Sequence, residues 1–293
     1  MIQSTTHSIE APDGTRLLVR EWEAASPWAA VLVVHGIGEH SGRYEQTGAD
    51  LATAGLVTIS FDLRGHGSSG GHRVYTPNFD RLLDDLAAML EETRRRGLPT
   101  VLLGHSLGGL IAFCYALSDR PRPDYLVLSA PALDSTVPAY RKFLGRILNR
   151  ITPKLMMKND FRGEQLSRDA AVGRAYFADP LVQTKTTVRL GIEAFRAMEY
   201  ADQYGYRLEV PTLVIHGAAD TLVPPTASAP LTRLAPVERH LLPQFRHESF
   251  NEVGREQAIS LVVDWIHARV EGGDHQAGAP EPAPAEDGEP AAS

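Results

Sequence analysis

Residues 99–112 read PTVLLGHSLGGLIA, and this stretch decides which fold the sequence favours. The apolar run from Thr100 to Leu103 predicts a short, fully buried strand. A glycine-rich turn follows, and apolar residues then recur at helical spacing as far as Leu117. The Gly-x-Ser-x-Gly pattern at a strand–turn–helix junction predicts that Ser106 projects above the sheet edge as a nucleophile. The alternative is an idle serine, because the five-residue pattern alone also recurs by chance.

Short apolar runs and amphipathic segments alternate along most of the chain. Residues 7–23 predict a hairpin, and residues 80–96 and 254–270 predict helices with one apolar face. Further buried strands are expected at residues 29–34, 56–62, 124–129, 211–215 and 238–242. This alternation predicts an α/β fold with a mostly parallel central sheet and helices on both faces. Ligands of such folds gather at the carboxyl ends of the strands.

A long segment without strand patterning divides the expected core. It runs for about 80 residues after the strand at 124–129, far longer than an ordinary crossover. Residues 131–208 are therefore expected to form a helical cap over the strand ends. The other expected divisions are an α/β core of residues 1–130 and 209–270 and a disordered tail of residues 271–293, rich in Ala, Pro and Glu.

Composition and charge exclude several classes of protein. The 293 residues carry a formal net charge of −7, but residues 271–293 hold six acidic residues and no Lys or Arg. Without those six, 30 acidic residues face 29 basic ones, which gives no case for nucleic-acid binding. The single cysteine, Cys114, rules out an internal disulfide and is expected to be buried. No signal-peptide pattern and no apolar stretch of roughly 20 residues is found, so we expect a cytoplasmic protein.

A serine nucleophile needs a base and an orienting carboxylate from elsewhere in the chain. His247 lies between the last expected strand and the closing helix, where a loop can bring an imidazole to the nucleophile turn. Asp220 follows the preceding strand and can orient that imidazole. The order Ser106, Asp220, His247 is the one that this type of fold uses. In the alternative for Asp220, this residue only forms a turn and Asp134 supplies the carboxylate. In the alternative for His247, it is an ordinary histidine of a surface loop.

Attack by serine creates a negatively charged oxygen that needs two hydrogen-bond donors. We expect one donor to be the main-chain N–H of Leu107, the residue after the nucleophile. The other is expected at Ile37, which lies between two glycines after the strand at 29–34. Each such donor typically lowers the barrier by about 3 kcal/mol.

Several other polar residues also stand at expected strand ends. They include four histidines, His35, His66, His105 and His216. Their spacing matches no metal-binding pattern, so we expect structural hydrogen bonds for each and predict no metal or other cofactor. Asp62 and Arg64 are expected to form an ion pair that braces the loops, with a catalytic role as the alternative.

Three motifs together resemble a known family. They are HGIGEHSGRY at 35–44, DLRGHGSS at 62–69 and GHSLGG at 104–109. These residues resemble the α/β-hydrolase fold and, more narrowly, its monoacylglycerol lipase and lysophospholipase branch, which is related to the S33 serine aminopeptidases. The phrases LSRD at 166–169 and DPLV at 179–182 fit the same branch. The resemblance runs from about residue 7 to residue 270.

The resemblance assigns roles to individual residues. It implies a triad of Ser106, Asp220 and His247 and oxyanion donors at Ile37 and Leu107. It also implies that Glu39 and Arg43 lie near the glycerol head group, with bracing of their loop as the equal alternative. Animal members carry a second histidine three residues after the catalytic one, where this chain has Phe250. The polar end of the site is therefore expected to differ from theirs.

The activity that the resemblance implies is hydrolysis of carboxylic esters. We expect cleavage of monoacylglycerol to fatty acid and glycerol through an acyl-enzyme intermediate. A lysophospholipase or a broad medium-chain carboxylesterase is the alternative. A peptidase and a non-catalytic binding protein of the same fold are further alternatives. Dehalogenases and epoxide hydrolases of this fold need a carboxylate nucleophile at position 106, so the serine there argues against both.

The expected cap contains a basic amphipathic segment. Its apolar residues recur at helical spacing and are Tyr140, Phe143, Leu144, Ile147, Leu148 and Ile151. Residues 141–162 carry seven basic residues against Asp160 alone. This pattern is typical of a helix that docks on an anionic lipid surface, here the inner face of a membrane. The alternative is a helix whose apolar face packs on the core.

Overall fold

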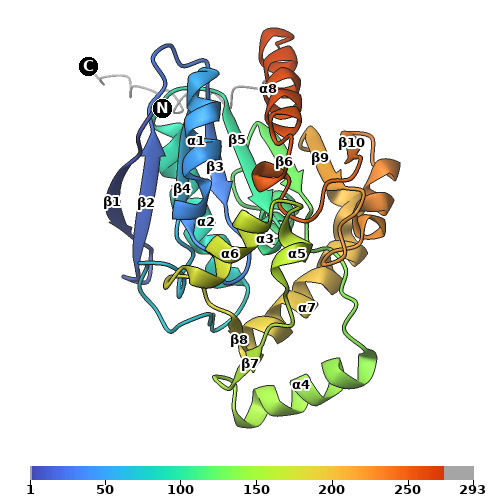
Figure 1. Ribbon diagram of the computed structural model, residues 1–293. Helices are drawn as coiled ribbons and strands as arrows, with labels where there is room; N and C mark the ends of the chain where they lie inside the picture. Colours follow the sequence, from blue (N-terminus) through green and yellow to red (C-terminus); the bar gives the residue numbers. More distant parts are fainter. Residues whose placement is uncertain (1, 274–293) are drawn as a thin grey trace, which may run out of the picture.

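The computed structural model describes residues 2–273, and an eight-stranded sheet organises them (Figure 1). Its strands are β1 (Thr5–Glu10), β2 (Arg16–Trp22), β3 (Ala29–Val34), β4 (Leu56–Phe61), β5 (Thr100–His105), β6 (Tyr125–Ser129), β9 (Thr212–Gly217) and β10 (Val237–Leu242). Their order is β1-β2-β4-β3-β5-β6-β9-β10. Neighbours pair in parallel from β4 to β10, whereas β2 is antiparallel to both β1 and β4. The central strands are buried on both faces, which explains their uninterrupted apolar sequences.

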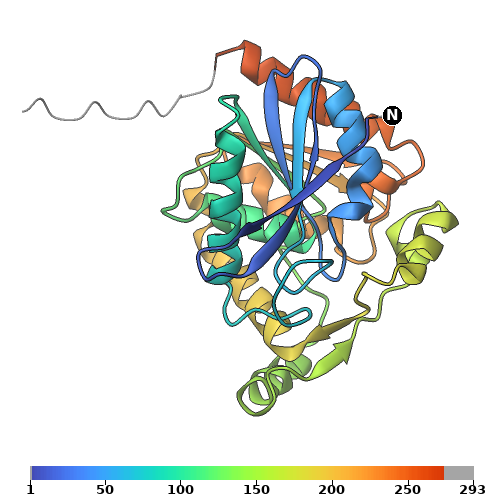
Figure 2. The same cartoon turned by 90° about the vertical axis from the view of Figure 1, so that its left-hand side faces the viewer.

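Helices cover both faces of this sheet. Those of the core are α1 (Glu45–Thr53), α2 (Asp80–Arg94), α3 (Leu107–Ala116) and α8 (Glu256–Glu271). Within β3, Leu32 packs with α2 and α3, whereas Val31 and Val33 pack with α1 and α8. Alternate side chains of one strand therefore enter two different cores, as the two-residue period of a strand requires. Figure 2 shows the sheet running between these two layers. The predicted α/β class is confirmed.

The segment between β6 and β9 has its own small architecture. It contains α4 (Ala139–Ile151), β7 (Met156–Lys158), α5 (Gly163–Leu166), α6 (Ala170–Ala178), β8 (Lys185–Thr187) and α7 (Val188–Tyr204). The expectation of a segment without strands was wrong, because β7 and β8 pair antiparallel. Strands of three residues are too short to show a period of two in the sequence. In Figure 1, α4, β7 and β8 lie below the sheet.

Four 3₁₀ helices complete the described chain. They are η1 (Ser41–Tyr44), η2 (Gly205–Arg207), η3 (Pro225–Arg233) and η4 (Ser249–Asn251). Of the tail expected at 271–293, Glu271 ends α8, and residues 274–293 lie outside the described residues. The division into a core at 1–130 and 209–270 and a cap at 131–208 stays a prediction.

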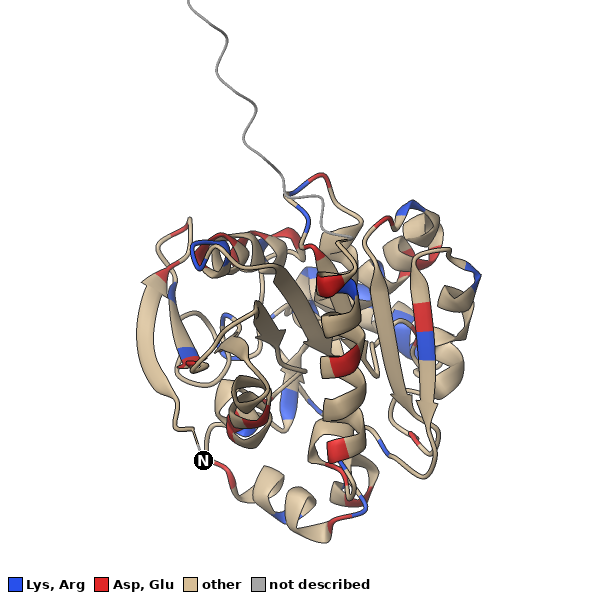
Figure 3. Cartoon of the chain, turned by 90° about the horizontal axis from the view of Figure 1, so that it is seen from above, with Lys and Arg blue, Asp and Glu red and all other residues tan. Residues whose placement is uncertain are grey.

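Charged residues of both signs lie along the elements that are seen from above, where Figure 3 shows them intermingled. This distribution agrees with the near balance of charges outside the acidic end of the chain. Within residues 2–273, no helix combines the length and the apolar character that crossing a bilayer requires.

Candidate active site

The turn between β5 and α3 holds Ser106 in a strained conformation. Its φ of 53° and ψ of −117° lie in a region that side chains rarely adopt. The flanking glycines make room for this turn. A Cβ on Gly104 would lie 2.4 Å from the carbonyl oxygen of Gly108, and one on Gly108 would lie 2.1 Å from that of Val34. Close packing of strand and helix thus explains the glycines and presents the serine hydroxyl at the end of β5.

Three residues that are distant in the sequence meet at this turn. Nε2 of His247 lies 3.0 Å from Oγ of Ser106, and Nδ1 of His247 lies 2.7 Å from Oδ2 of Asp220. The other carboxylate oxygen of Asp220 accepts from the main-chain N–H groups of Leu222 and Val223, which fixes its orientation. The hydrogen-bonded path from serine through imidazole to carboxylate is the arrangement in which the imidazole can take the serine proton.

The alternative carboxylate lies elsewhere. Asp134 is exposed and accepts a hydrogen bond from the main-chain N–H of the adjacent Ser135. The structure therefore brings together Ser106, Asp220 and His247 and leaves Asp134 outside this group.

Electrostatics keep the imidazole basic and the carboxylate charged. Burial alone would lower the pKa of His247, but the charge and the hydrogen bond of Asp220 outweigh it and raise that pKa above its ordinary value. Burial would raise the pKa of Asp220, but His247 and the donors around the carboxylate hold it well below its usual range. The neighbouring ring of His105 is different, because burial and the nearby His247 lower its pKa to about 4.

The expected oxyanion donors lie on either side of the serine. Leu107 is the first residue of α3, so its N–H has no partner within the helix. Ile37 follows β3, in a loop that passes close to the serine, since a Cβ on Gly36 would lie 3.2 Å from Cβ of Ser106. Among residues 2–273, neither N–H donates to a protein acceptor. Both groups are therefore free to bind a substrate oxygen.

A buried cluster of charged residues braces the loop that carries Ile37. Glu39 accepts hydrogen bonds from the N–H of Gly36 at 2.6 Å and from the hydroxyl of Tyr44 at 3.0 Å. Arg43 lies between Glu39 and Glu248, at 2.7 Å from the first carboxylate and 2.8 Å from the second. Although burial opposes it, the charge of Arg43 helps to lower the pKa of Glu39 to about 2. These contacts favour bracing, and a contact with the head group stays a prediction.

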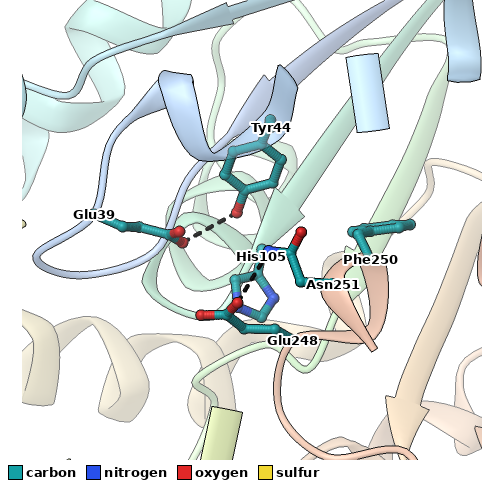
Figure 4. Close-up of a pocket in the computed structure, with 6 residues that line it drawn as sticks. All are labelled: Glu39, Tyr44, His105, Glu248, Phe250 and Asn251. Carbon is teal, nitrogen blue, oxygen red and sulfur yellow. Dashed lines mark hydrogen bonds between the residues drawn. The ribbon is translucent and has the colours of Figure 1, made fainter. Parts of the chain in front are cut away.

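A cavity of about 10 Å³ lies inside this cluster, enough for about one water molecule (Figure 4). It is lined by Glu39, Tyr44, His105, Glu248, Phe250 and Asn251. In Figure 4, the Glu39 carboxylate points at the Tyr44 hydroxyl, and Asn251 donates to Glu248 at 3.0 Å. The ring of Phe250 lines one side, so this residue contributes no polar side-chain atom to the cavity.

A larger hollow of about 710 Å³ lies between α5 and α6. Arg168, Arg174, Phe177 and Arg246 are among the residues that line it. Ser106 lines neither this hollow nor the small cavity. An acyl-chain pocket under the segment 131–208 therefore stays a prediction.

The expected ion pair between Asp62 and Arg64 was wrong. Asp62 accepts from the main-chain N–H and hydroxyl of Ser41 and from the N–H of Ser68, so its charge is satisfied by neutral donors. Arg64 instead donates two hydrogen bonds of 2.6 Å to Asp85 of α2. Asp85 is buried, and a buried carboxylate needs a cation more than one that already has three donors.

The four histidines at strand ends make structural hydrogen bonds, as expected. Nε2 of His35 accepts from the N–H of Leu63, and the rings of His66, His105 and His216 lie within hydrogen-bond distance of nearby oxygens. Within residues 2–273, no three His, Cys, Asp or Glu side chains gather where they could hold a metal ion. Cys114 is buried, and burial raises the pKa of its thiol.

Sequence reasoning missed two buried carboxylates next to His247. Glu248 pairs with Arg43, and Glu252 accepts hydrogen bonds from Ser167 and Arg168 between α5 and α6. A carboxylate in a polar loop is expected to be exposed, so only the tertiary structure shows that these two are buried. The LSRD motif at 166–169 was the sequence signal that could have indicated this contact, since two of its residues contact Glu252.

Comparison with known proteins connects this geometry to a family. The model of the family described as "Serine aminopeptidase, S33" matches residues 25–254. The chain belongs to this family. It is 31% identical over 277 residues to a monoacylglycerol lipase of Mycolicibacterium smegmatis, covering 91% of this chain and 99% of that protein. It is 32% identical over 230 residues to human monoglyceride lipase, covering 75% of this chain and 74% of that protein.

A solved structure supports the same conclusion. The crystal structure of a monoacylglycerol lipase from Paleococcus ferrophilus superposes with a TM-score of 0.78 at 32% identity, covering 85% of this chain and 98% of that one. This S33 family member therefore has the α/β-hydrolase fold and is an enzyme that hydrolyses carboxylic esters.

Proposed function

We propose that this family member hydrolyses monoacylglycerols, with Ser106, His247 and Asp220 as its catalytic triad. The observation that carries the proposal is the unbroken hydrogen-bond path from Oγ of Ser106 through His247 to Asp220. The names of the relatives from Mycolicibacterium smegmatis and human support the choice of substrate. A lysophospholipase and a medium-chain carboxylesterase are the alternatives, since each uses the same triad on another ester.

The proposed reaction proceeds through an acyl-enzyme. Nε2 of His247 takes the proton of Ser106 while Oγ bonds to the ester carbonyl carbon. The carbonyl oxygen becomes negatively charged and accepts hydrogen bonds from the N–H groups of Ile37 and Leu107. The carbon–oxygen bond to glycerol then breaks, and His247 returns the proton to the glycerol oxygen.

Deacylation repeats these steps with water. His247 takes a proton from a water molecule as the water oxygen bonds to the acyl carbon, and the same two N–H groups stabilise the negative oxygen. The bond from the acyl carbon to Oγ of Ser106 breaks, and Oγ recovers the proton from His247. Fatty acid leaves, and no cofactor takes part. Asp220 stays ionised throughout and stabilises the imidazolium.

We also propose that the segment 131–208 is a cap whose α4 docks on an anionic bilayer. Large apolar side chains of α4 are exposed, including Phe143 at 62% and Ile151 at 71%. Basic side chains such as Arg141 and Arg150 of the same helix are also exposed. Exposed apolar groups beside a cluster of positive charge fit an anionic membrane surface better than water. Docking would attach the protein to the membrane periphery and bring lipid esters to the cap.

A substrate panel tests the proposal. Monoacylglycerol, lysophosphatidylcholine, a medium-chain ester and a peptide are offered to wild type and to Ser106→Ala, together with a fluorophosphonate label for active serines. We expect wild type to prefer monoacylglycerol and to take the label, and Ser106→Ala to do neither. Preference for lysophosphatidylcholine or the medium-chain ester would favour the alternatives. Wild type that neither labels nor turns over any ester would contradict an enzymatic role.

A further inference from the structure

The loop that carries His247 is held by the segment between β6 and β9 as well as by the core. The N–H of His247 donates to the carbonyl oxygen of Gln165 at 3.3 Å, and the N–H of Glu248 donates to that of Leu166 at 2.9 Å. The side chain of Arg246 adds a hydrogen bond of 3.1 Å to the carbonyl oxygen of Ser167. The main chain at the end of α5 is therefore paired with the His247 loop through main-chain hydrogen bonds.

A single carboxylate fastens this contact. Oε1 of Glu252 lies 3.2 Å from the hydroxyl of Ser167 and 3.0 Å from the N–H of Arg168, both in the α5–α6 junction. Its Oε2 accepts from the N–H of Arg246 at 2.9 Å, next to His247. Nε of Arg168 lies 3.3 Å from Oε1 and pairs with the charge. One buried side chain thus holds both partners of the contact.

The number of donors explains how Glu252 remains charged without contact with solvent. Its side chain is 0% exposed. Although burial raises the pKa of a carboxyl group, the hydrogen bonds from Arg246, Val253, Arg168 and Ser167 lower that of Glu252 below its usual value. A glutamine of the same shape would turn an NH₂ group toward N–H donors, so the cluster requires a carboxylate.

We propose that Glu252 is a positioning residue for His247, which it keeps in register by clamping residues 166–168 to the His247 loop. The inference rests on the proposed function, because positioning matters only if His247 is the base. Gln165 extends the clamp to the loop of Asp220, since its amide donates to the hydroxyl of Thr221, the residue after Asp220, at 3.2 Å. Part of the segment proposed as a cap therefore acts as a support of the triad.

The clamp affects how His247 titrates. The charged and titratable groups that face its ring are Asp220, Glu248, Glu39 and His105. Of these, Asp220 is hydrogen-bonded to Nδ1. If the loop loosens, the interaction of the imidazole with Asp220 weakens most, because a hydrogen bond depends more steeply on distance than the charge interactions with the other three groups do. The pKa of His247 then falls. A shift of the acid limb of the pH profile therefore shows that His247 has been displaced. A purely structural role of Glu252 would leave the acid limb unchanged.

The test compares Glu252→Gln with Glu256→Gln, the same chemical change on an exposed residue of α8. For each, kcat/KM is measured across pH, with thermal unfolding and the hydrogen exchange of peptides spanning 165–168 and 246–250. In Glu252→Gln we expect kcat/KM to fall by about 10- to 100-fold through kcat, as a displaced catalytic group commonly causes. We also expect its acid limb to move to lower pH and both peptides to exchange faster. Glu256→Gln should match wild type.

A second variant covers the case in which Glu252→Gln does not fold. Arg168→Gln removes one partner of Glu252 at a side chain that is 31% exposed, and it should give the same changes to a smaller degree. Unchanged kcat/KM, acid limb and exchange in a folded variant, with only a lower melting temperature, would overturn the inference. Wild type that is inactive on every ester would instead sink the proposed function, and the exchange data would still report whether Glu252 holds the loop.

Discussion

Arg43 donates two hydrogen bonds of 2.8 Å to the two carboxylate oxygens of Glu248, the residue after His247. The same guanidinium lies 2.7 Å from Glu39, which accepts the N–H of Gly36 beside the expected oxyanion donor Ile37. One side chain therefore connects the loop after β3 with the loop after β10. The two loops carry the oxyanion donor and the base of the proposed mechanism, so their spacing depends on this pair.

Removing Arg43 should destabilise the protein strongly. Arg43→Met leaves two buried carboxylates without their cation, and loss of one partner of a buried ion pair typically costs about 3–5 kcal/mol. Denaturant unfolding measures the change. Arg95→Met, at the residue that follows α2 and a side chain 66% exposed, is the matched control and should change the free energy of unfolding by about 0.5 kcal/mol or less. Equal effects of the two substitutions would contradict a bracing role.

Arg43→Lys separates bracing from contact with the substrate. Lysine keeps the charge but cannot donate to two oxygens in the planar geometry of Arg43 and Glu248. If Arg43 braces the loops, kcat should fall with little change in KM. A raised KM for monoacylglycerol with unchanged kcat would instead support the head-group contact that the family resemblance implies.

Asp220→Asn should lower kcat by about 10⁴-fold, because an amide stabilises the wrong tautomer of the imidazole and no imidazolium. The fold should survive, since Leu222 and Val223 can still donate to the amide oxygen. Single-turnover acylation by a chromogenic ester measures the effect. Asp134→Asn is the control and should retain wild-type activity, and loss of activity there would reverse the assignment.

The acid limb of the pH profile of kcat/KM should have a raised midpoint. His247 acts as a base only when neutral, and its pKa is raised above the ordinary 6.5. Activity should therefore fall as pH drops, with a midpoint above 6.5 in wild type. In Asp220→Asn the midpoint should move down, because the largest interaction that opposes burial and raises the pKa of His247 is then lost. A wild-type midpoint below 6.5 would show that Asp220 does not raise the pKa of His247.

Vesicle binding should depend on the basic side chains of α4. Arg141→Gln with Arg150→Gln removes two positive charges, each contributing about 1 kcal/mol near an anionic bilayer, so partitioning should fall by roughly 30-fold. Flotation with anionic and zwitterionic vesicles measures it. The control is Arg95→Gln with Arg122→Gln, which removes two positive charges away from α4. Wild type that floats with neither type of vesicle, while it remains active on dispersed substrate, would contradict membrane docking.

Two glycines give opposite predictions for substitution by alanine. A Cβ on Gly108 would lie 2.1 Å from a carbonyl oxygen of β3, whereas a Cβ on Gly191 of α7 would meet nothing within 4 Å. Gly108→Ala should therefore displace the serine turn and abolish labelling by a fluorophosphonate. Gly191→Ala should raise the free energy of unfolding by about 0.5–1 kcal/mol, because alanine loses less entropy in a helix. Thermal melts of both variants check the pair.

The strands and the turn at Ser106 could be predicted because their signals are local. Buried parallel strands appear in the sequence as uninterrupted apolar runs, and a serine between glycines at a strand end is a recognisable motif. The order Ser106, Asp220, His247 follows from the same fold. These residues met in the structure as expected, within hydrogen-bond distance of one another.

The rest depends on tertiary contacts that the sequence does not display. Both Asp62 and Asp85 are buried, and Arg64 pairs with Asp85 because Ser41 and Ser68 already donate to Asp62. Glu248 and Glu252 look like solvent-exposed loop residues until Arg43 and the α5–α6 junction enclose them. The three-residue strands β7 and β8 are stable only as a pair, and their pairing joins residues about 30 positions apart.

The strands β6 and β9 are adjacent and parallel, so the segment between them leaves the sheet at the carboxyl end of β6 and re-enters it at the opposite end, at the start of β9. A foreign lid could be grafted between these two ends if its last part returns along the strands, as the crossover between parallel neighbours requires. The contacts of Glu252 limit that freedom. A transplanted lid without groups equivalent to Ser167 and Arg168 would leave an unpaired buried charge beside the base. Changing the specificity of this enzyme by exchanging lids should therefore succeed only when that short anchor is retained.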